Sequence, residues 1–123
     1  MKLSWCTIHV HDMEQSKSFY GKFLGLRKTR SFSPQKGTEI VFFSDEDSIE
    51  IELIHNEKAP LSEGTCRVSL GLRTKNFDEL LVKAKEGGFS LSGPLILGED
   101  MECFFLQDPD GVGIQMIRDE TVI

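Results

Sequence analysis

The sequence predicts an α+β fold in which two βαβββ modules form a curved, partly open barrel with helices outside. Three observations lead to this prediction: two helix-start signals, strands with alternating apolar residues, and an offset of about 64 residues that relates both kinds of element. Two copies are too few for a solenoid, so we expect a closed pseudo-twofold pair. A chain of 123 residues is one domain's worth, and residues 1–123 are expected to form a single domain.

Each module is expected to carry one helix after its first strand. Asp12, with Gln15 three residues later, is a capping signal, and Gly25 ends the first predicted helix. The second helix is expected to begin at Asn76, again with a carboxylate in the third position, and to end at Gly87-Gly88. Apolar residues recur at helical spacing in both: Met13, Phe19, Tyr20, Phe23 and Leu24 in the first, and Phe77, Leu80, Leu81 and Ala84 in the second.

The strands repeat with the same offset. First strands are expected at 5–12 and 69–76, and last strands follow the turns 45–47 and 109–111. The charged segment that contains Pro60 is typical of a linker. The predicted organisation is therefore an N-terminal module at 1–56, a linker at 57–65 and a C-terminal module at 66–120.

Alternation along the strands assigns each of them an apolar face and a polar face. The apolar set should face the helices: Cys6, Ile8, Val10, Ile49, Ile51, Leu53, Val68, Leu70, Leu72, Ile114 and Met116. A sparsely filled polar face must meet water or enclose a polar cavity, so the opposite set is the candidate ligand site. Its members are Trp5, Thr7, His9, Glu50, Glu52, Ser69, Gly71, Arg73, Gly113 and Gln115.

Composition and charge exclude several classes of partner. The net charge is −6 and no basic cluster offsets it, so we expect neither nucleic acid nor an anionic membrane as partner. No apolar run approaches the roughly 20 residues that span a bilayer, and the first residues lack the apolar core of a secretory signal. Three widely spaced cysteines are expected to be free thiols in a reducing cytoplasm, with Cys6 in the core.

Three segments together resemble the vicinal oxygen chelate superfamily, which includes glyoxalase I, bleomycin-binding proteins, fosfomycin-resistance enzymes and extradiol dioxygenases. They are HDMEQSKSFYGKFLGL, VSLGLRTKNFDELLVKAKEGG and DPDGVGIQMI. The resemblance covers nearly the whole chain and implies the paired βαβββ fold, often as a homodimer. It leaves the reaction open, since this scaffold carries many chemistries.

The resemblance also implies where a metal would be held in glyoxalase I-like members. The corresponding positions here are Trp5, Glu52, Ser69 and Gln115, and only Glu52 is a good ligand. Indole offers no free lone pair, and an amide in place of the usual glutamate cannot act as a general base. A catalytic site needs about three protein ligands, so we expect no metal cofactor; the remaining route to zinc, nickel or manganese is Glu52 with His9.

Several side chains allow two interpretations each. His9 stands where glyoxalase I-like members place an arginine for a substrate carboxylate, or it merely lines the cavity, while His11 and His55 are expected to be exposed or structural. Glu50 and Glu52 are candidate catalytic acids or bases and candidate anchors for a cation; alternatively they pair with Arg73 in a charged network. Trp5 either stacks a planar or cationic ligand or plugs the cavity.

Residues near the final turn complete the candidate site. Phe105 and Cys103 precede that turn and are candidate lining residues, with uncertain register, whereas Asp108 and Asp110 are expected to form the turn. The leading prediction is a metal-independent protein that binds a small organic ligand. The alternatives are a lyase, isomerase or dioxygenase that uses a displaced metal or metal-free acid–base chemistry, and a structural dimer with a plugged cavity.

Overall fold

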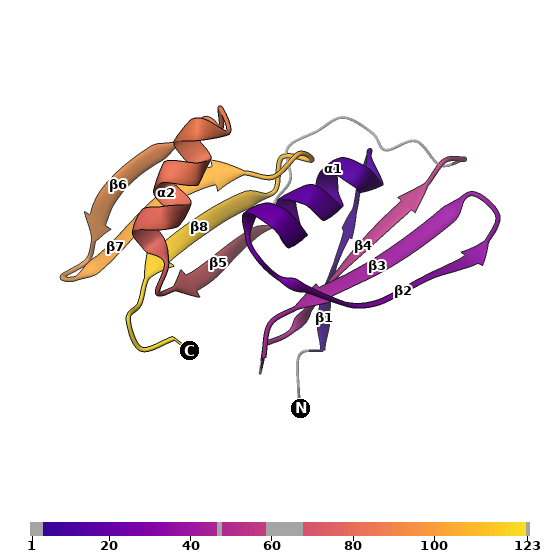
Figure 1. Cartoon of the computed structure of the whole chain (residues 1–123), viewed down its shortest axis with the longest axis horizontal. Helices are drawn as coiled ribbons and strands as arrows, with labels where there is room; N and C mark the ends of the chain where they lie inside the picture. The colour runs from indigo at the N-terminus through magenta and orange to yellow at the C-terminus, as the bar shows by residue number, and fades with distance from the viewer. Residues whose placement is uncertain (1–3, 47, 59–67, 123) are drawn as a thin grey trace. The chain divides into compact units, whose positions relative to one another are not determined.

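The computed structural model describes residues 4–46, 48–58 and 68–122. The chain divides between residues 63 and 64 into two compact units, unit 1 and unit 2, each described here by itself. Unit 1 contains β1 (Trp5–His9), α1 (Met13–Lys17), η1 (Ser18–Phe23), β2 (Arg27–Gln35), β3 (Thr38–Ser44) and β4 (Glu50–Asn56). Unit 2 contains β5 (Ser69–Thr74), α2 (Phe77–Glu86), β6 (Ser92–Leu97), β7 (Met101–Gln107) and β8 (Gly113–Arg118) (Figure 1).

Each unit is a four-stranded mixed sheet with the same topology. The strand orders are β1-β4-β3-β2 and β5-β8-β7-β6, and in each sheet the first strand pairs in parallel with the last while the other pairs are antiparallel. The α+β prediction of two βαβββ modules is therefore confirmed. The predicted linker lies outside the described residues except for Glu57 and Lys58, and the Glu57 N–H donates to the Gly37 carbonyl oxygen at 2.9 Å.

The sheets refine the repeat. Trp5 lies opposite Glu50 in β1 and β4, as Ser69 lies opposite Gly113 in β5 and β8. The first strands are thus related by an offset of 64 residues, whereas the last strands are related by one residue fewer. Glu52 and Gln115 consequently hold equivalent places in the two units, as the resemblance implies.

The first helix is where the sequence prediction is partly wrong. Asp12 caps α1 as expected, because its Oδ1 accepts from the Gln15 N–H at 3.1 Å, and Gly25 has the left-handed φ of +76°. After Lys17, however, the helix widens into the π-helical segment η1, in which the Leu24 N–H donates to the carbonyl of Phe19 at 2.9 Å. Apolar spacing does not distinguish these two helix types over a single turn.

The second helix keeps its predicted place but not its predicted cap. Helix α2 begins at Phe77, and the Asn76 side chain makes no capping hydrogen bond. Instead the Asn76 N–H donates to Thr74 Oγ1 at 3.0 Å, so the threonine stabilises the entry to the helix. Gly88 follows the helix with a φ of +75°, as the double glycine predicts.

Each helix covers the apolar face of its own sheet. In unit 2 the rings of Phe77 on α2 and Phe104 on β7 meet edge to face at 5.2 Å, and both are buried. Most of the predicted helix-facing set is buried: Ile8, Val10, Ile51, Leu53, Ile114 and Met116. The prediction is wrong for Ile49 and Val68, which precede β4 and β5 and are 42% and 51% exposed. Cys6 is only partly buried.

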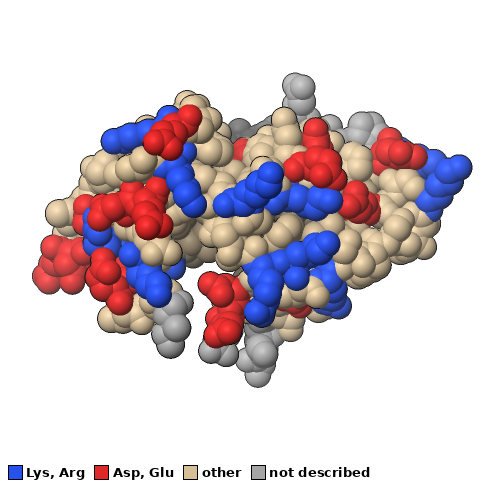
Figure 2. All heavy atoms as spheres, in the orientation of Figure 1, with Lys and Arg blue, Asp and Glu red and all other residues tan. Residues whose placement is uncertain are grey.

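The surface carries mixed charge. On the face drawn in Figure 2, basic and acidic side chains lie next to one another over both units. In unit 2 one such group surrounds Arg118, which pairs with Asp78, Glu102 and Glu120. Among the described residues, no helix is both long and apolar enough to cross a membrane.

Candidate functional site

The predicted site residues of unit 1 lie together on one side of its sheet. In the parallel register of β1 and β4, Trp5 is opposite Glu50, Thr7 opposite Glu52 and His9 opposite Ile54. Because side chains alternate along a strand, Trp5, Thr7, His9, Glu50 and Glu52 all point away from the helix-covered side. We call this side, together with Thr29, Arg30, Phe32 and Phe42 described below, the open face of unit 1.

Both carboxylates on the open face accept hydrogen bonds from other strands of the sheet: Glu52 from the adjacent β1, and Glu50 from β2, which lies beyond β3. The Thr7 hydroxyl donates to Glu52 Oε1 at 2.6 Å. Glu50 accepts from the Thr29 hydroxyl at 2.7 Å and from Arg30 Nη2 at 3.3 Å. Glu50 therefore has a cationic partner within its own unit, whereas Glu52, as far as the structure describes the chain, accepts from a neutral hydroxyl and pairs with no cation.

An aromatic cluster lies beside these carboxylates. The Trp5 ring meets the Phe42 ring edge to face with their centroids 6.1 Å apart, and the Phe32 ring is stacked with Phe42 at a centroid distance of 6.3 Å. Phe42 is only 2% exposed, although it lies on the open face, because these neighbours and Arg30 cover it. Trp5 is 54% exposed, so this residue is not enclosed among its neighbours.

Sequence reasoning missed four residues of the open face, all on β2 and β3: Thr29, Arg30, Phe32 and Phe42. A bulge causes the first two omissions, since the register of β2 shifts between Lys28 and Arg30 and brings Thr29 and Arg30 to Glu50. Nothing in the sequence marks this bulge. Phe42 had a signal, because the unbroken apolar run 40–43 indicates a strand covered on both faces.

The predicted site residues of unit 2 form a second group on its own sheet. Gly71 and Phe105 both lie opposite Gln115, on either side of β8, so Phe105 and Gln115 share a face with Ser69 and Arg73. Gly71 and Gly113 carry no side chains on this face, and Ser69 leaves little room at Gly113, because a Cβ there would lie 3.2 Å from the Cβ of Ser69. The register that the sequence left uncertain for Phe105 is thus settled.

Charged and polar side chains of this second group already have partners. Arg73 Nη1 lies 3.3 Å from Asp119 Oδ2. Hydrogen bonds from the Thr121 hydroxyl and backbone, with a smaller contribution from Arg73, lower the pKa of Asp119 below its ordinary 3.8. Gln115 Nε2 donates to the Met101 sulfur at 3.6 Å, so this amide points along the sheet face.

Other residues weighed from the sequence are structural. His55 Nδ1 lies 3.1 Å from the Val10 carbonyl oxygen, which ties β4 to the end of β1. Asp108 Oδ1 accepts the backbone N–H groups of Asp110 and Val112, both at 2.8 Å, and so forms the predicted turn. Cys103 is fully buried, and His11 is exposed.

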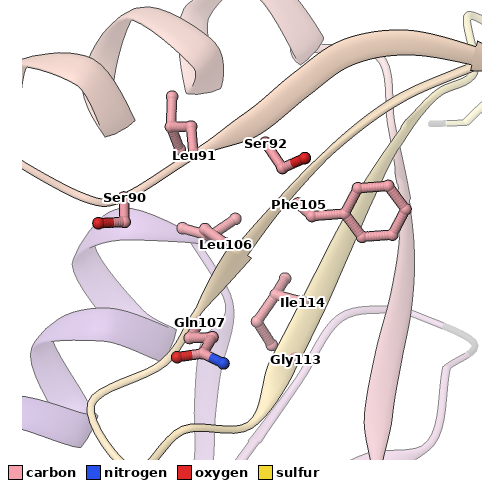
Figure 3. A pocket seen from close by; sticks show the side chains of 8 residues that line it. All are labelled: Ser90, Leu91, Ser92, Phe105, Leu106, Gln107, Gly113 and Ile114. Atoms are coloured by element: carbon pink, nitrogen blue, oxygen red, sulfur yellow. The ribbon is translucent and has the colours of Figure 1, made fainter.

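Unit 2 also has a groove of about 350 Å³ beside the start of β6, the end of β7 and the start of β8. Figure 3 shows the Phe105 ring and the Leu106 side chain pointing to different sides of β7 at this groove. Its lining is mostly apolar and consists of Ser90, Leu91, Ser92, Phe105, Leu106, Gln107, Gly113 and Ile114.

The donor set fits a metal ion poorly. Of the four positions that the resemblance implies, Trp5 offers no lone pair, Ser69 a neutral hydroxyl and Gln115 an amide. Glu52 is a sound ligand, but one of its oxygens already accepts the Thr7 hydroxyl. Within the described ranges, no three His, Cys, Asp or Glu side chains gather as a metal-binding group. A catalytic metal normally needs about three protein ligands, and these residues do not supply them.

Comparison with known proteins agrees with this fold. The sequence profile of the Glyoxalase/Bleomycin resistance protein/Dioxygenase superfamily matches residues 2–116. The chain is 28% identical over 128 aligned residues to a lactoylglutathione lyase of Escherichia coli O157:H7, covering 98% of this chain and 94% of that protein. The chain therefore belongs to the glyoxalase/bleomycin resistance/dioxygenase superfamily.

Solved structures with the same fold include both enzymes and binding proteins. A maize (Zea mays) glyoxalase I variant superposes with a TM-score of 0.80 at 20% identity, over 94% of this chain and 44% of that one. An antibiotic-binding protein from Streptomyces sp. CB03234 superposes with a TM-score of 0.72 at 20% identity, over 96% of this chain and 95% of that one. At these identities the superpositions establish the fold alone.

Proposed function

We propose that this protein binds a small organic cation with an aromatic ring on the open face of unit 1, without a metal ion. The observation that carries this proposal is the half-exposed Trp5 ring, which lies on the same face as Glu50 and Glu52. A cation gains both from the face of an indole ring and from a nearby carboxylate. The acidic chain, with a net charge of −6, also favours the approach of cations.

Each residue of the open face has a distinct proposed role. Trp5 stacks the ligand ring, and Glu52 anchors the positive charge because, in the described part of the chain, its carboxylate accepts from the neutral Thr7 hydroxyl and pairs with no cation. Thr7 orients that carboxylate, and His9 lines the far end of β1. In unit 2, we propose that Ser69, Arg73, Phe105 and Gln115 form a ligand-contacting group on their own sheet face. The fold shared with an antibiotic-binding protein supports recognition of a small molecule.

A second candidate function is a lyase reaction like that of the Escherichia coli relative. The observation in its favour is the match over nearly the whole of both chains. Against it stands Gln115, an amide in place of the usual glutamate, which cannot abstract a proton. A metal-free version would need Glu52 or Glu50 as the acid or base. Formation of lactoylglutathione by the purified, metal-free protein would favour this candidate over binding alone.

Tryptophan fluorescence tests the proposal directly, because Trp5 is the single tryptophan of the chain. Cationic aromatic compounds are titrated against the protein, with their neutral isosteres as ligand controls. We expect saturable changes in emission with the cations. Glu52→Gln should weaken binding about tenfold or more, since a charge-assisted hydrogen bond is lost.

The matched control is Glu46→Gln, which removes the same charge from an exposed position of the same unit. It should leave affinity unchanged. Equal affinity for Glu52→Gln and wild type would remove Glu52 from the site, and no response to any cation would overturn the proposal.

We further propose that two copies of the chain pair, as many members of the superfamily do.

A further inference from the structure

Arg30 holds a particular position on the open face of unit 1. Its guanidinium carbon lies 3.8 Å from the centroid of the Phe42 ring and 6.0 Å from that of Trp5. Its Nη2 lies 3.3 Å from Glu50 Oε1. A planar cation of the chain itself is thus stacked on an aromatic ring, with a carboxylate at its side.

The chain places this group through the bulge in β2. Since the register shifts between Lys28 and Arg30, the Arg30 side chain reaches across β3 to Glu50 on β4. Phe42 is 2% exposed with the guanidinium in place. The guanidinium therefore covers a ring face on which another planar group could stack.

The contacts that hold Arg30 there are weak. The Arg30 side chain is 48% exposed and that of Glu50 is 27% exposed, so water screens their ion pair. The hydrogen bond is long at 3.3 Å, and a cation–π contact at an exposed site adds little more. An external planar cation that also carries an aromatic ring could replace the guanidinium and contact Trp5 as well.

We propose that the Arg30 guanidinium occupies the position on the Phe42 ring that the cationic group of the ligand takes, and that it leaves this ring when the ligand binds. The ligand class is then a flat, delocalised cation such as an aryl amidinium or an aryl guanidinium. Such a group stacks on Phe42 and has N–H donors for Glu50, as Arg30 does, and for Glu52, which lies opposite Phe42 in the sheet. A compact ammonium ion is more strongly hydrated and has no plane to stack, so it is a poorer ligand. This inference rests on the proposed function and adds both the ligand class and a residue that sets its affinity.

The test compares three probes in the Trp5 fluorescence titration: benzamidinium as the planar cation, benzylammonium as the compact cation and benzamide as the neutral isostere. Wild type should prefer benzamidinium. Arg30→Ala should bind benzamidinium about five- to tenfold more tightly than wild type, because the internal competitor is gone. Arg30→Gln keeps an uncharged polar chain on the exposed strand and should shift affinity in the same direction.

Lys28→Ala is the matched control. It removes a cation from the same strand, but Lys28 lies opposite Phe43, whose ring faces the helix-covered side of the sheet. Its benzamidinium affinity should equal that of wild type. Benzoate is titrated as well, because an anion would need Arg30 as its anchor and would lose affinity in Arg30→Ala.

The outcomes separate this inference from the proposed function. Suppose that both Arg30 variants bind benzamidinium no more tightly than wild type, while cation binding still depends on Glu52. That result would overturn the proposal that Arg30 occupies the ligand's position and would leave the proposed function standing. Benzoate binding that depends on Arg30 would likewise overturn it. If neither wild type nor the Arg30 variants respond to any cation, the proposed function fails and this inference fails with it.

Discussion

Phe42 is the residue on which the shape of the open face of unit 1 depends. Its ring is contacted from one side by Trp5, from another by Phe32 and over its plane by Arg30. Without this ring, Trp5 and Arg30 would both lose the aromatic side chain against which they pack. A residue on the polar side of a sheet thereby becomes part of the core.

This position leads to a stability prediction. Phe42→Ala should lower the free energy of unfolding by about 3 kcal/mol, the lower end for a buried phenylalanine, because one side of the site can collapse. Urea unfolding followed by Trp5 emission measures the change. Phe32→Ala is the control: this ring is 46% exposed, so its loss should cost about 1 kcal/mol or less. Equal losses in the two variants would contradict the supporting role of Phe42.

The sequence allowed prediction of some site residues but not others, for physical reasons. Trp5, Thr7, Glu50 and Glu52 follow from strict alternation on strands with one apolar face, and the register bears this alternation out. Arg30 does not follow, because one extra residue in a bulge turns a side chain to the other face. Side-chain partners across strands, such as Thr29 with Glu50, need the strand order as well.

At the scale of elements, Arg118 fastens α2 to its sheet. From β8 its two terminal nitrogens donate to the Asp78 carboxylate at 3.1 and 2.8 Å, and its Nε donates to Glu102 on β7 at 2.7 Å. The guanidinium also lies 4.5 Å from the Phe77 ring centroid. One side chain thus connects the first turn of α2 to two strands. These hydrogen bonds raise the pKa of Arg118, with the largest contribution from Asp78, so the guanidinium stays charged.

The pair predicts how stability depends on pH. Hydrogen bonds from Arg118 hold the pKa of Asp78 below its ordinary 3.8, so the folded state binds this proton less readily than the unfolded chain. The stabilisation is therefore complete above the ordinary pKa and is lost as the pH falls through the lower folded value. Between about pH 5 and pH 2.5, wild type should lose stability more steeply than Asp78→Asn.

Urea midpoints measured at each pH check this prediction. Glu79→Gln is the control, because it removes a neighbouring carboxylate from the same exposed turn of α2. Its pH profile should parallel that of wild type. Parallel profiles for Asp78→Asn and wild type would mean that the pair with Arg118 contributes no pH-dependent stability.

Elements were predicted well where the signal is local and long. Both helices start where the sequence indicates, and the strands near the helices alternate as expected. The switch from α1 to η1 at Ser18 was not predictable, since a π-helical turn differs from an α-helical one by a single hydrogen-bond step. Ile49 and Val68 were misassigned because each stands just outside its strand, where alternation no longer fixes direction.

At the scale of the whole molecule, the two units have the same topology but different side chains on their open faces. On β1 and β4, unit 1 carries Trp5, Thr7, His9, Glu50 and Glu52, whereas on the equivalent β5 and β8 unit 2 carries Ser69, Arg73, Gln115 and two glycines. We therefore expect the purified protein to hold no stoichiometric divalent metal. Elemental analysis should find well below one equivalent per chain, and chelation should leave the melting temperature unchanged. Nearly one equivalent of nickel, zinc or manganese would contradict this.

The proposed pairing of two chains is tested by light scattering. A stable pair gives twice the chain mass of 13.9 kDa across a dilution series. A mass equal to that of one chain at all concentrations would contradict the proposed pair.

The parallel pairing of first and last strands has a consequence for how the protein emerges from the ribosome. Thr7 and Glu52 are joined by a hydrogen bond although 45 positions separate them. The first strand of each unit, β1 or β5, therefore stays unpaired until the last strand of that unit, β4 or β8, has been synthesised. The N-terminal sheet can close while the other half is still being translated, so the two halves can fold one after the other.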